Sequence, residues 1–206
     1  MDVTEPASVV LAPGAAAVLR TLAGADTAFT IRQLARIAGV SHSRAHQVVH
    51  RLAEHGLVLA EQFGNAKLCR LNRDHLAADI VIQLTRLRAK MVELLRREIA
   101  GWKLRPDHAS LFGSAARGDG DTSSDLDVLV VRPAGSAEDG VTWEEQLLAA
   151  GQRIYSATGN HVAWFDISID DMRRSVRAGQ PLIDEWRRDS IDLAGTKLGL
   201  LLRELS

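Results

Sequence analysis

Cysteine is nearly absent from this sequence, and long apolar runs are lacking as well. Cys69 is the only cysteine among 206 residues, which excludes an intrachain disulfide and agrees with a reducing cytoplasm. No apolar run approaches the roughly 20 residues that a membrane span needs, so we expect no membrane partner. The segment from Met1 to Glu5 lacks the basic flank of a signal peptide, and export is therefore not expected. These absences predict a cytoplasmic protein.

An overall excess of positive charge is also lacking. The formal net charge is −1, so a function that involves nucleic acid must come from a local patch. One such patch lies between Thr30 and Arg51, where the sequence has no Asp or Glu. Its four arginines are Arg32, Arg36, Arg44 and Arg51.

The residues around this patch predict two helices separated by a tight turn. Thr30 and Ser41 are suited to cap the two helices, and Gly39 is suited to end the first. Alternating residues after Gly56 then predict two strands, joined by a turn at Gly64 and Asn65. The predicted elements are helices over 13–23, 31–38 and 42–55 and strands over 57–62 and 67–71.

Helix, glycine-containing turn, helix and hairpin together resemble the winged helix-turn-helix of bacterial transcription regulators. The resemblance implies that the helix beginning at His42 enters the major groove of DNA, and that the hairpin reaches backbone phosphate or the minor groove. A winged helix used only for protein contacts is the alternative. The candidate DNA contacts are Ser41, His42, Ser43, Arg44, Gln47 and Arg51 on the helix, with Lys67 and Arg70 on the wing.

Three histidines in the same helix raise a second possibility. His42, His46 and His50 recur every four residues, which can place adjacent pairs on one helix face as metal ligands. No nearby cysteine or acidic residue completes such a site, so we favour polar rings that face DNA.

A long linker helix is predicted over 75–100. Its apolar residues recur at near-heptad spacing, so the stripe could dock on either flanking domain or pair with a second copy in a homodimer. The stripe consists of Leu76, Ile80, Leu84, Leu87, Met91 and Leu94.

The stretch from Leu111 to Val131 has the clearest chemical meaning. Asp125 and Asp127 lie two residues apart in a strand-like segment, so both carboxylates point to one face. Like charges this close repel unless a cation lies between them, and carboxylate oxygens suit Mg²⁺ or Mn²⁺. Upstream, Gly113 follows a short apolar strand, and Ser114 is expected to cap a helical turn whose N-terminus can bind phosphate.

These residues resemble the signature of the minimal nucleotidyltransferases, a branch of the DNA polymerase beta-like superfamily. The resemblance is carried by Gly113-Ser114, Arg117-Gly118 and Ser124-Asp125-Leu126-Asp127. It implies that Asp125 and Asp127 hold two Mg²⁺ ions, with Mn²⁺ as the alternative, and that these ions bridge the triphosphate of an NTP. It also implies phosphate binding by Gly113, Ser114, Arg117 and Ser124. A surface loop followed by an acidic edge strand is the competing interpretation.

The family also has a third carboxylate on a neighbouring strand. We assign Asp166 to this role, in a strand predicted over 161–169, as a third metal ligand and the group that activates the acceptor hydroxyl. In that strand Asp166 shares a face with Trp164, which could line the nucleotide pocket, while Ala163 and Phe165 lie on the other face.

The resulting fold class is α+β. We predict a winged helix-turn-helix domain over 1–74, the linker helix over 75–100, and a nucleotidyltransferase domain over 101–206 with a small mixed sheet flanked by helices. In the last domain we expect a loop over 133–140, helices over 143–157, 181–188 and 196–205, and a short strand-like piece over 191–193.

The resemblance implies transfer of a nucleoside monophosphate, with AMP from ATP as the expected group, to a hydroxyl of a protein or RNA. Members of the family often act as antitoxins that adenylylate a HEPN-domain toxin, so a HEPN-type toxin is the expected protein acceptor, and DNA binding would add autoregulation. Two alternatives are a transcription regulator whose transferase domain only senses nucleotide, and an antibiotic-modifying enzyme.

Overall fold

The chain folds into two compact units. The computed structural model describes residues 1–64, 66–133 and 140–205. One unit comprises Glu5–Arg88, and the other comprises Met1–Thr4 together with Ala89–Ser206. These bounds differ from the predicted domains, because the first four residues belong to the C-terminal unit and the predicted linker helix is divided between the two. Most of the predicted loop over 133–140, and Asn65 of the predicted turn, lie outside the described residues.

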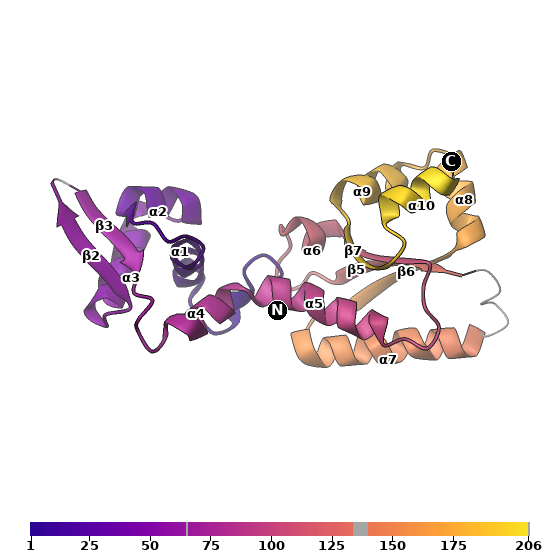
Figure 1. Ribbon diagram of the computed structural model, residues 1–206, viewed down its shortest axis with the longest axis horizontal. Helices are drawn as coiled ribbons and strands as arrows, with labels where there is room; N and C mark the ends of the chain where they lie inside the picture. The colour runs from indigo at the N-terminus through magenta and orange to yellow at the C-terminus, as the bar shows by residue number, and fades with distance from the viewer. Residues whose placement is uncertain (65, 134–139, 206) are drawn as a thin grey trace. The chain divides into compact units, whose positions relative to one another are not determined.

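The N-terminal unit has the predicted helices and hairpin (Figure 1). Its three-stranded antiparallel sheet has the order β1-β3-β2. Strand β1 was not predicted, since two residues are too few to show a period. The elements are η1 (Pro6–Val9), α1 (Pro13–Ala23), β1 (Phe29–Thr30), α2 (Ile31–Ala38), α3 (His42–Glu54), β2 (Val58–Phe63), β3 (Ala66–Leu71) and α4 (Ala78–Thr85).

Side-chain caps explain why α2 and α3 begin where the sequence predicts. The Thr30 hydroxyl accepts from the Gln33 amide at 3.2 Å, and the Gln33 side chain accepts from the Thr30 amide at 2.8 Å, which forms a capping box. Gly39 ends α2 in the left-handed conformation, with φ of 66°. The Ser41 hydroxyl then accepts from the Arg44 amide at 3.2 Å and fixes the start of α3.

The single linker helix over 75–100 is a prediction that the structure corrects. Helix α4 ends at Thr85 and a separate helix, α5 (Leu87–Ala100), follows, with Arg86 outside helical geometry at ψ of 5°. Leu76 precedes α4 and is 96% exposed, whereas Met91 is buried in the core of the C-terminal unit. The near-heptad stripe is therefore interrupted: Leu76 precedes α4, Ile80 and Leu84 lie in α4, and the remaining residues lie in α5. Pairing with a second copy stays a prediction.

The C-terminal unit is built on a four-stranded mixed sheet, as predicted. The strand order is β6-β5-β4-β7, with β5 and β6 parallel and the other pairs antiparallel. The strands are β4 (His108–Phe112), β5 (Leu126–Arg132), β6 (Val162–Ser168) and β7 (Ile191–Gly195), and the helices besides α5 are α6 (Gly113–Arg117), α7 (Gly140–Thr158), α8 (Ile169–Arg177), α9 (Pro181–Asp189) and α10 (Leu198–Leu205).

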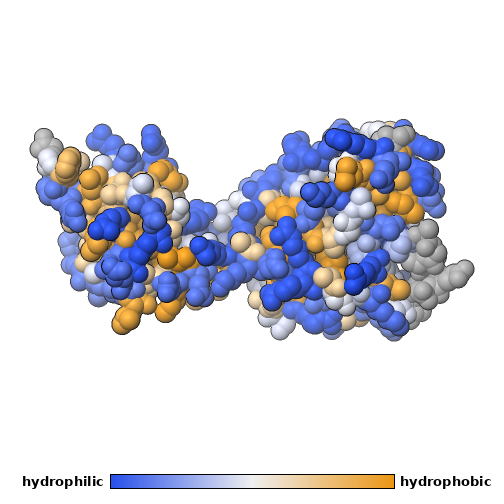
Figure 2. Space-filling model, viewed as in Figure 1, coloured by the Kyte–Doolittle hydropathy of each residue, from blue (hydrophilic) through white to orange (hydrophobic). Residues whose placement is uncertain are grey.

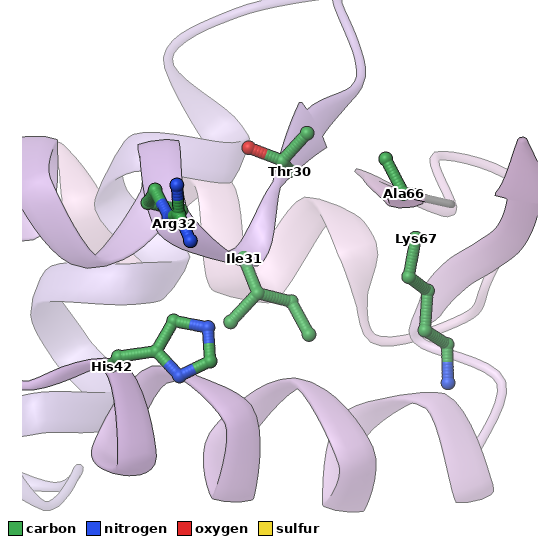
Figure 3. Close-up of a pocket in the computed structure, with 6 residues that line it drawn as sticks. All are labelled: Thr30, Ile31, Arg32, His42, Ala66 and Lys67. Atoms are coloured by element: carbon green, nitrogen blue, oxygen red, sulfur yellow. The ribbon is translucent and has the colours of Figure 1, made fainter. Parts of the chain in front are cut away.

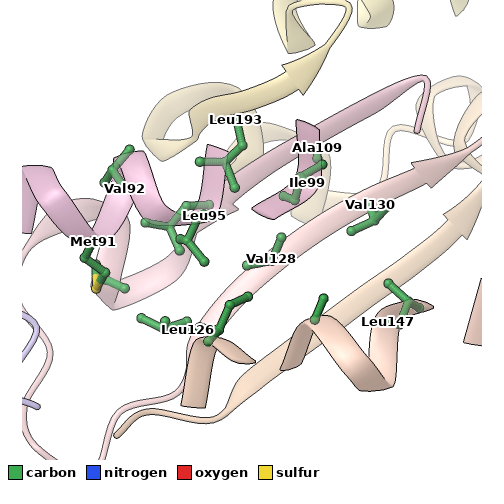
Figure 4. Packing of buried hydrophobic residues seen from close by; sticks show 14 of the residues in the cluster. Met91, Val92, Leu95, Ile99, Ala109, Leu126, Val128, Val130, Leu147 and Leu193 are labelled. Carbon is green, nitrogen blue, oxygen red and sulfur yellow. The ribbon is translucent and has the colours of Figure 1, made fainter. Parts of the chain in front are cut away.

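Helices cover both faces of this sheet, and successive residues of β5 contact opposite layers. Val128 and Val130 pack with Leu95 of α5 and with α7 residues (Figure 4). Leu129 and Val131 pack instead with residues of α8, α9 and α10. Figure 1 shows α5 and α7 on one side of the sheet and α8 to α10 on the other. The face to which any β5 or β6 side chain points therefore follows from its register.

Within the described ranges, no helix combines the length and the apolar character that crossing a bilayer requires. Figure 2 shows hydrophilic residues over most of the visible face of each unit, with smaller hydrophobic patches between them.

Candidate active site and nucleic-acid interface

The junction of β4 and α6 lies directly against Asp127. Phe112, the last residue of β4, is paired with Asp127 in the β4–β5 ladder. The next residue, Gly113, has φ of 68°, and a Cβ atom there would collide with the Asp127 carboxylate. Only glycine therefore fits this position, for both steric and backbone reasons. Helix α6 begins at Gly113 with Phe112 as its N-cap, so the prediction that Ser114 caps this turn was wrong.

Asp125 and Asp127 lie close enough at the start of β5 for their charges to interact. Asp125 is exposed and immediately precedes β5, while Asp127 is half-buried within the strand. Burial raises the pKa of Asp127, the charges of Asp125 and Glu185 raise it further, and Arg117 partly opposes them. An ionised Asp127 is thus unfavourable on its own, and a bound cation would reduce that cost.

Two of the predicted phosphate-binding residues meet around Gly120. A Cβ atom at Gly120 would lie 2.8 Å from the hydroxyl oxygens of both Ser114 and Ser124. The Ser124 hydroxyl also accepts from the Asp121 amide at 2.9 Å, which shapes the loop between α6 and β5. Two hydroxyls and the paired carboxylates are therefore brought to the same end of β5.

Arg117 is engaged by carboxylates in the structure. Its Nε lies 3.0 Å from Asp119, and its Nη1 lies 3.7 Å from Glu185 and 3.6 Å from Asp189. The hydrogen bond to Asp119 is the main reason that the pKa of Arg117 is raised. Arg117 thereby joins α6 to α9 and is not free for phosphate. Glu185 and Asp189 could not be predicted as partners of Arg117, because nothing in the spacing of α9 marks these acidic residues as neighbours of the signature.

Asp166, the predicted third carboxylate, is not brought to the pair. In the parallel β5–β6 ladder Asp166 is opposite Val130, whose side chain faces α5 and α7. Its Oδ1 lies 3.0 Å from Nε of Arg132, and burial raises the pKa of Asp166. Because Asp127 points to the opposite face of the sheet, Asp166 cannot share a ligand with it. Trp164 lies on the same face of the sheet as Asp166, away from Asp127, and packs edge-on against Trp102.

An alanine occupies the place beside Asp127 on β6. Ala163 is paired with Asp127, and Phe165 is paired with Leu129. Both residues are exposed, and Phe165 packs against the buried Trp186 at 5.1 Å between ring centroids. In the described part of the chain, no group of three or more His, Cys, Asp or Glu side chains is placed to hold a metal ion. Asp125 and Asp127 offer the carboxylate oxygens that Mg²⁺ prefers, and the phosphates of a nucleotide commonly supply its remaining ligands.

The candidate DNA contacts on α3 share one exposed surface of the helix. Ala45, Val48 and Val49 form its buried side. His46 and His50 are exposed on the same surface as the predicted contacts. Their rings are stacked, with 6.2 Å between the ring centroids. The exposed predicted residues are Ser41, His42, Ser43, Arg44, Gln47 and Arg51.

A hollow of about 400 Å³ lies between the starts of α2 and α3 and the wing (Figure 3). Arg32, His42 and Lys67 give it a basic lining, and Thr30 at the capped start of α2 contributes a hydroxyl. Arg32 belongs to the basic patch and is not among the predicted contacts. Together with His42 and Lys67 it brings basic side chains, of the kind that contact phosphate, to one hollow.

Arg70, the second predicted wing contact, lies elsewhere. Along β3, Cys69 and Leu71 are buried toward the helices, and Lys67 lies on the same face of the strand because it is two residues before Cys69. Arg70 lies on the opposite face of β3 and lines a separate hollow that includes Asp26 and Asp74. The structure therefore does not bring Arg70 to the α3 surface.

Family models match both units. The MarR family model matches residues 11–62, and the nucleotidyltransferase domain model matches residues 94–163. No curated protein matches the chain. The chain therefore joins a MarR-type winged helix domain to a nucleotidyltransferase domain, in an α+β fold.

Several solved structures resemble parts of the chain. A toxin-antitoxin with AMP-PNP is 23% identical, covers 57% of this chain and 82% of its own, and has a TM-score of 0.36. A predicted DNA-binding transcriptional regulator from E. coli is 24% identical, with 34% and 73% covered and a TM-score of 0.31. TrmBL2, an archaeal chromatin protein, is 16% identical, with 84% and 71% covered and a TM-score of 0.28. Similarity at this level carries no conclusion about function.

Proposed function

We propose that this fusion binds DNA through α3 and transfers a nucleoside monophosphate from an NTP to a hydroxyl group of a protein or RNA. The acceptor oxygen bonds to the α-phosphorus, the bond from that phosphorus to the bridging oxygen of the β-phosphate breaks, and pyrophosphate leaves. The observation that supports transfer is the convergence at the start of β5. Gly113 leaves room for the Asp127 carboxylate, Asp125 adds a second, and Ser114 and Ser124 bring hydroxyls nearby. Two carboxylates beside phosphate-binding groups are typical of phosphoryl chemistry, where positioning and charge neutralisation dominate catalysis.

Each residue has a proposed part in this reaction. The hydroxyls of Ser114 and Ser124 would bind the triphosphate, and Gly113 would let it approach the backbone. Asp125 and Asp127 would hold Mg²⁺ or Mn²⁺, which when bound would neutralise phosphate charge. Arg117 would keep α9 against α6 through its ion pairs. Transfer of AMP from ATP and a HEPN-type toxin as acceptor are narrower proposals that rest on the family resemblance alone.

A pair of matched variants tests the transferase. Asp127→Asn and Asp166→Asn each remove the charge of a half-buried aspartate, on adjacent strands but on opposite sheet faces. With labelled ATP, a divalent cation and a co-purified acceptor, Asp127→Asn should lower transfer by about a thousandfold or more. Asp166→Asn should keep transfer near the wild-type rate. Equal loss in both variants would contradict the proposed site.

Nucleotide sensing is a second candidate, which the alanine opposite Asp127 favours. β6 places Ala163 beside Asp127, so this strand contributes no carboxylate at the position from which an acceptor hydroxyl could be activated. A sensor would bind NTP tightly and alter DNA affinity without transferring label. Ala163→Asp would add a carboxylate at an exposed position beside Asp127, and a rise in transfer would show that the wild-type domain is limited by the missing group.

A further inference from the structure

The first four residues of the chain lie against the loop that precedes β5. This loop, residues 118–125, has neither helix nor strand and includes Ser124 and Asp125. Val3 is fully buried, and a Cβ atom at Gly120 would lie 2.6 Å from its side chain. The Thr4 hydroxyl donates to the Gly120 carbonyl. The segment thus contacts the middle of the loop through both packing and a hydrogen bond.

Asn160 ties the same segment to the end of the loop. It lies between α7 and β6 and is only 3% exposed. Its Nδ2 donates to the Met1 carbonyl at 2.9 Å and to the Ser124 carbonyl at 3.0 Å. Because both partners are carbonyl oxygens, only the NH₂ end of the amide can face them. One buried side chain therefore joins the first residue of the chain to the residue before Asp125.

We infer that Asn160 and the segment Met1–Thr4 form a brace that positions the 118–125 loop for nucleotide binding and transfer. The inference rests on the proposed function and adds positioning residues to it. Asp125 is exposed, and the brace contacts its loop at Gly120 and at Ser124, the residue directly before Asp125. A loop that is fixed before the nucleotide arrives avoids the ordering cost of binding and keeps reacting groups in place.

Two variants remove the brace in different ways. Asn160→Ala deletes both amide donations, and Thr4→Val deletes the hydroxyl donation while keeping the shape of the side chain. Each has a matched control that loses a hydrogen bond involving no residue of the loop or of the brace. Ser110→Ala removes a buried contact to His108, and Thr21→Val removes a donation to the Ala17 carbonyl. All four are measured in the full chain for KM and kcat with ATP, for nucleotide affinity, and for amide hydrogen exchange over 118–125.

The brace variants should raise the KM for nucleotide by about five- to tenfold, as expected for lost hydrogen bonds, and speed exchange over 118–125. Both controls should leave the KM and loop exchange at the wild-type values. Brace variants that match their controls would overturn the inference. If the wild-type chain transfers no label, the transferase proposal fails, but nucleotide affinity and loop exchange still decide whether the brace exists. Thr4→Val keeps the test valid if Asn160→Ala does not fold.

Discussion

The α3 surface and the Asp127 site differ in how their residues come together. The α3 surface is one stretch of one helix, so spacing alone places Arg44, Gln47 and Arg51 on the exposed side. The Asp127 site draws on the strands β4, β5 and β6, the short helix α6 and α9, so its composition depends on register and tertiary packing. The spacing of residues along the sequence is therefore enough to predict the α3 surface, but not to predict the Asp127 site.

After Asp127→Asn, the next largest expected effect on transfer is at Gly113, where the backbone lies directly against the Asp127 carboxylate. Gly113→Ala places a Cβ atom into the Asp127 carboxylate and forces an alanine to adopt φ of 68°. Gly179→Ala imposes the same kind of backbone strain at φ of 61°, with no atom within 4 Å of the added Cβ. Transfer should fall by about a hundredfold or more in Gly113→Ala, since small displacements at a reacting site are costly. Gly179→Ala should lose only about 1–2 kcal/mol of stability from strain.

Steady-state transfer and urea unfolding, measured on both variants, separate the effect of backbone strain from the effect of the collision with the Asp127 carboxylate. Similar losses of transfer in Gly113→Ala and Gly179→Ala would show that strain, and not contact with Asp127, explains the requirement for glycine at position 113.

The sequence predicts the features that depend on neighbouring residues and misses those that depend on tertiary packing. Caps at Thr30 and Ser41, the turn glycine at 39 and the alternation in β5 act over a few residues, and the structure confirms the elements they predict. The face of Asp166 within its own strand was also predicted correctly, together with Trp164. The prediction that Asp166 and Asp127 point to the same face of the sheet was wrong. The register that pairs Asp166 with Val130 is set by tertiary packing, and no pattern of neighbouring residues in the sequence reveals it.

A smaller effect sharpens the contrast within the winged helix unit. Arg51 lies on the exposed surface of α3, whereas Arg70 lies on the outer face of the wing near Asp26. Arg51→Ala should weaken binding to duplex DNA by about tenfold and reduce the salt dependence by roughly one phosphate contact. Arg70→Ala removes the same charge and should change affinity less than about twofold.

Fluorescence anisotropy titrations at several salt concentrations measure both quantities. Equal losses in the two variants would mean that net charge, and not the α3 surface, decides the affinity.

The smallest effect concerns a buried histidine, in contrast to the exposed histidines of α3. His108 is fully buried, with Nδ1 2.8 Å from the Thr196 carbonyl and Nε2 2.9 Å from the Ser110 hydroxyl. A carbonyl only accepts, so Nδ1 carries the proton and Nε2 accepts from Ser110. Burial lowers the pKa of His108 below that of a free histidine. The native state therefore keeps His108 neutral at a pH where the unfolded chain already binds a proton.

The sign of the pH effect follows from that difference. Below about pH 6.5 the unfolded state binds the extra proton, so the free energy of unfolding falls as the pH falls, by at most about 1.4 kcal/mol per pH unit from this group. His108→Gln cannot make this contribution. Urea unfolding at pH 7.5 gives the packing cost of the substitution alone, and the gap between wild type and variant should narrow by about 1 kcal/mol at pH 5.5. A gap that stays constant between the two pH values would show that His108 takes up a proton equally in the folded and unfolded chain.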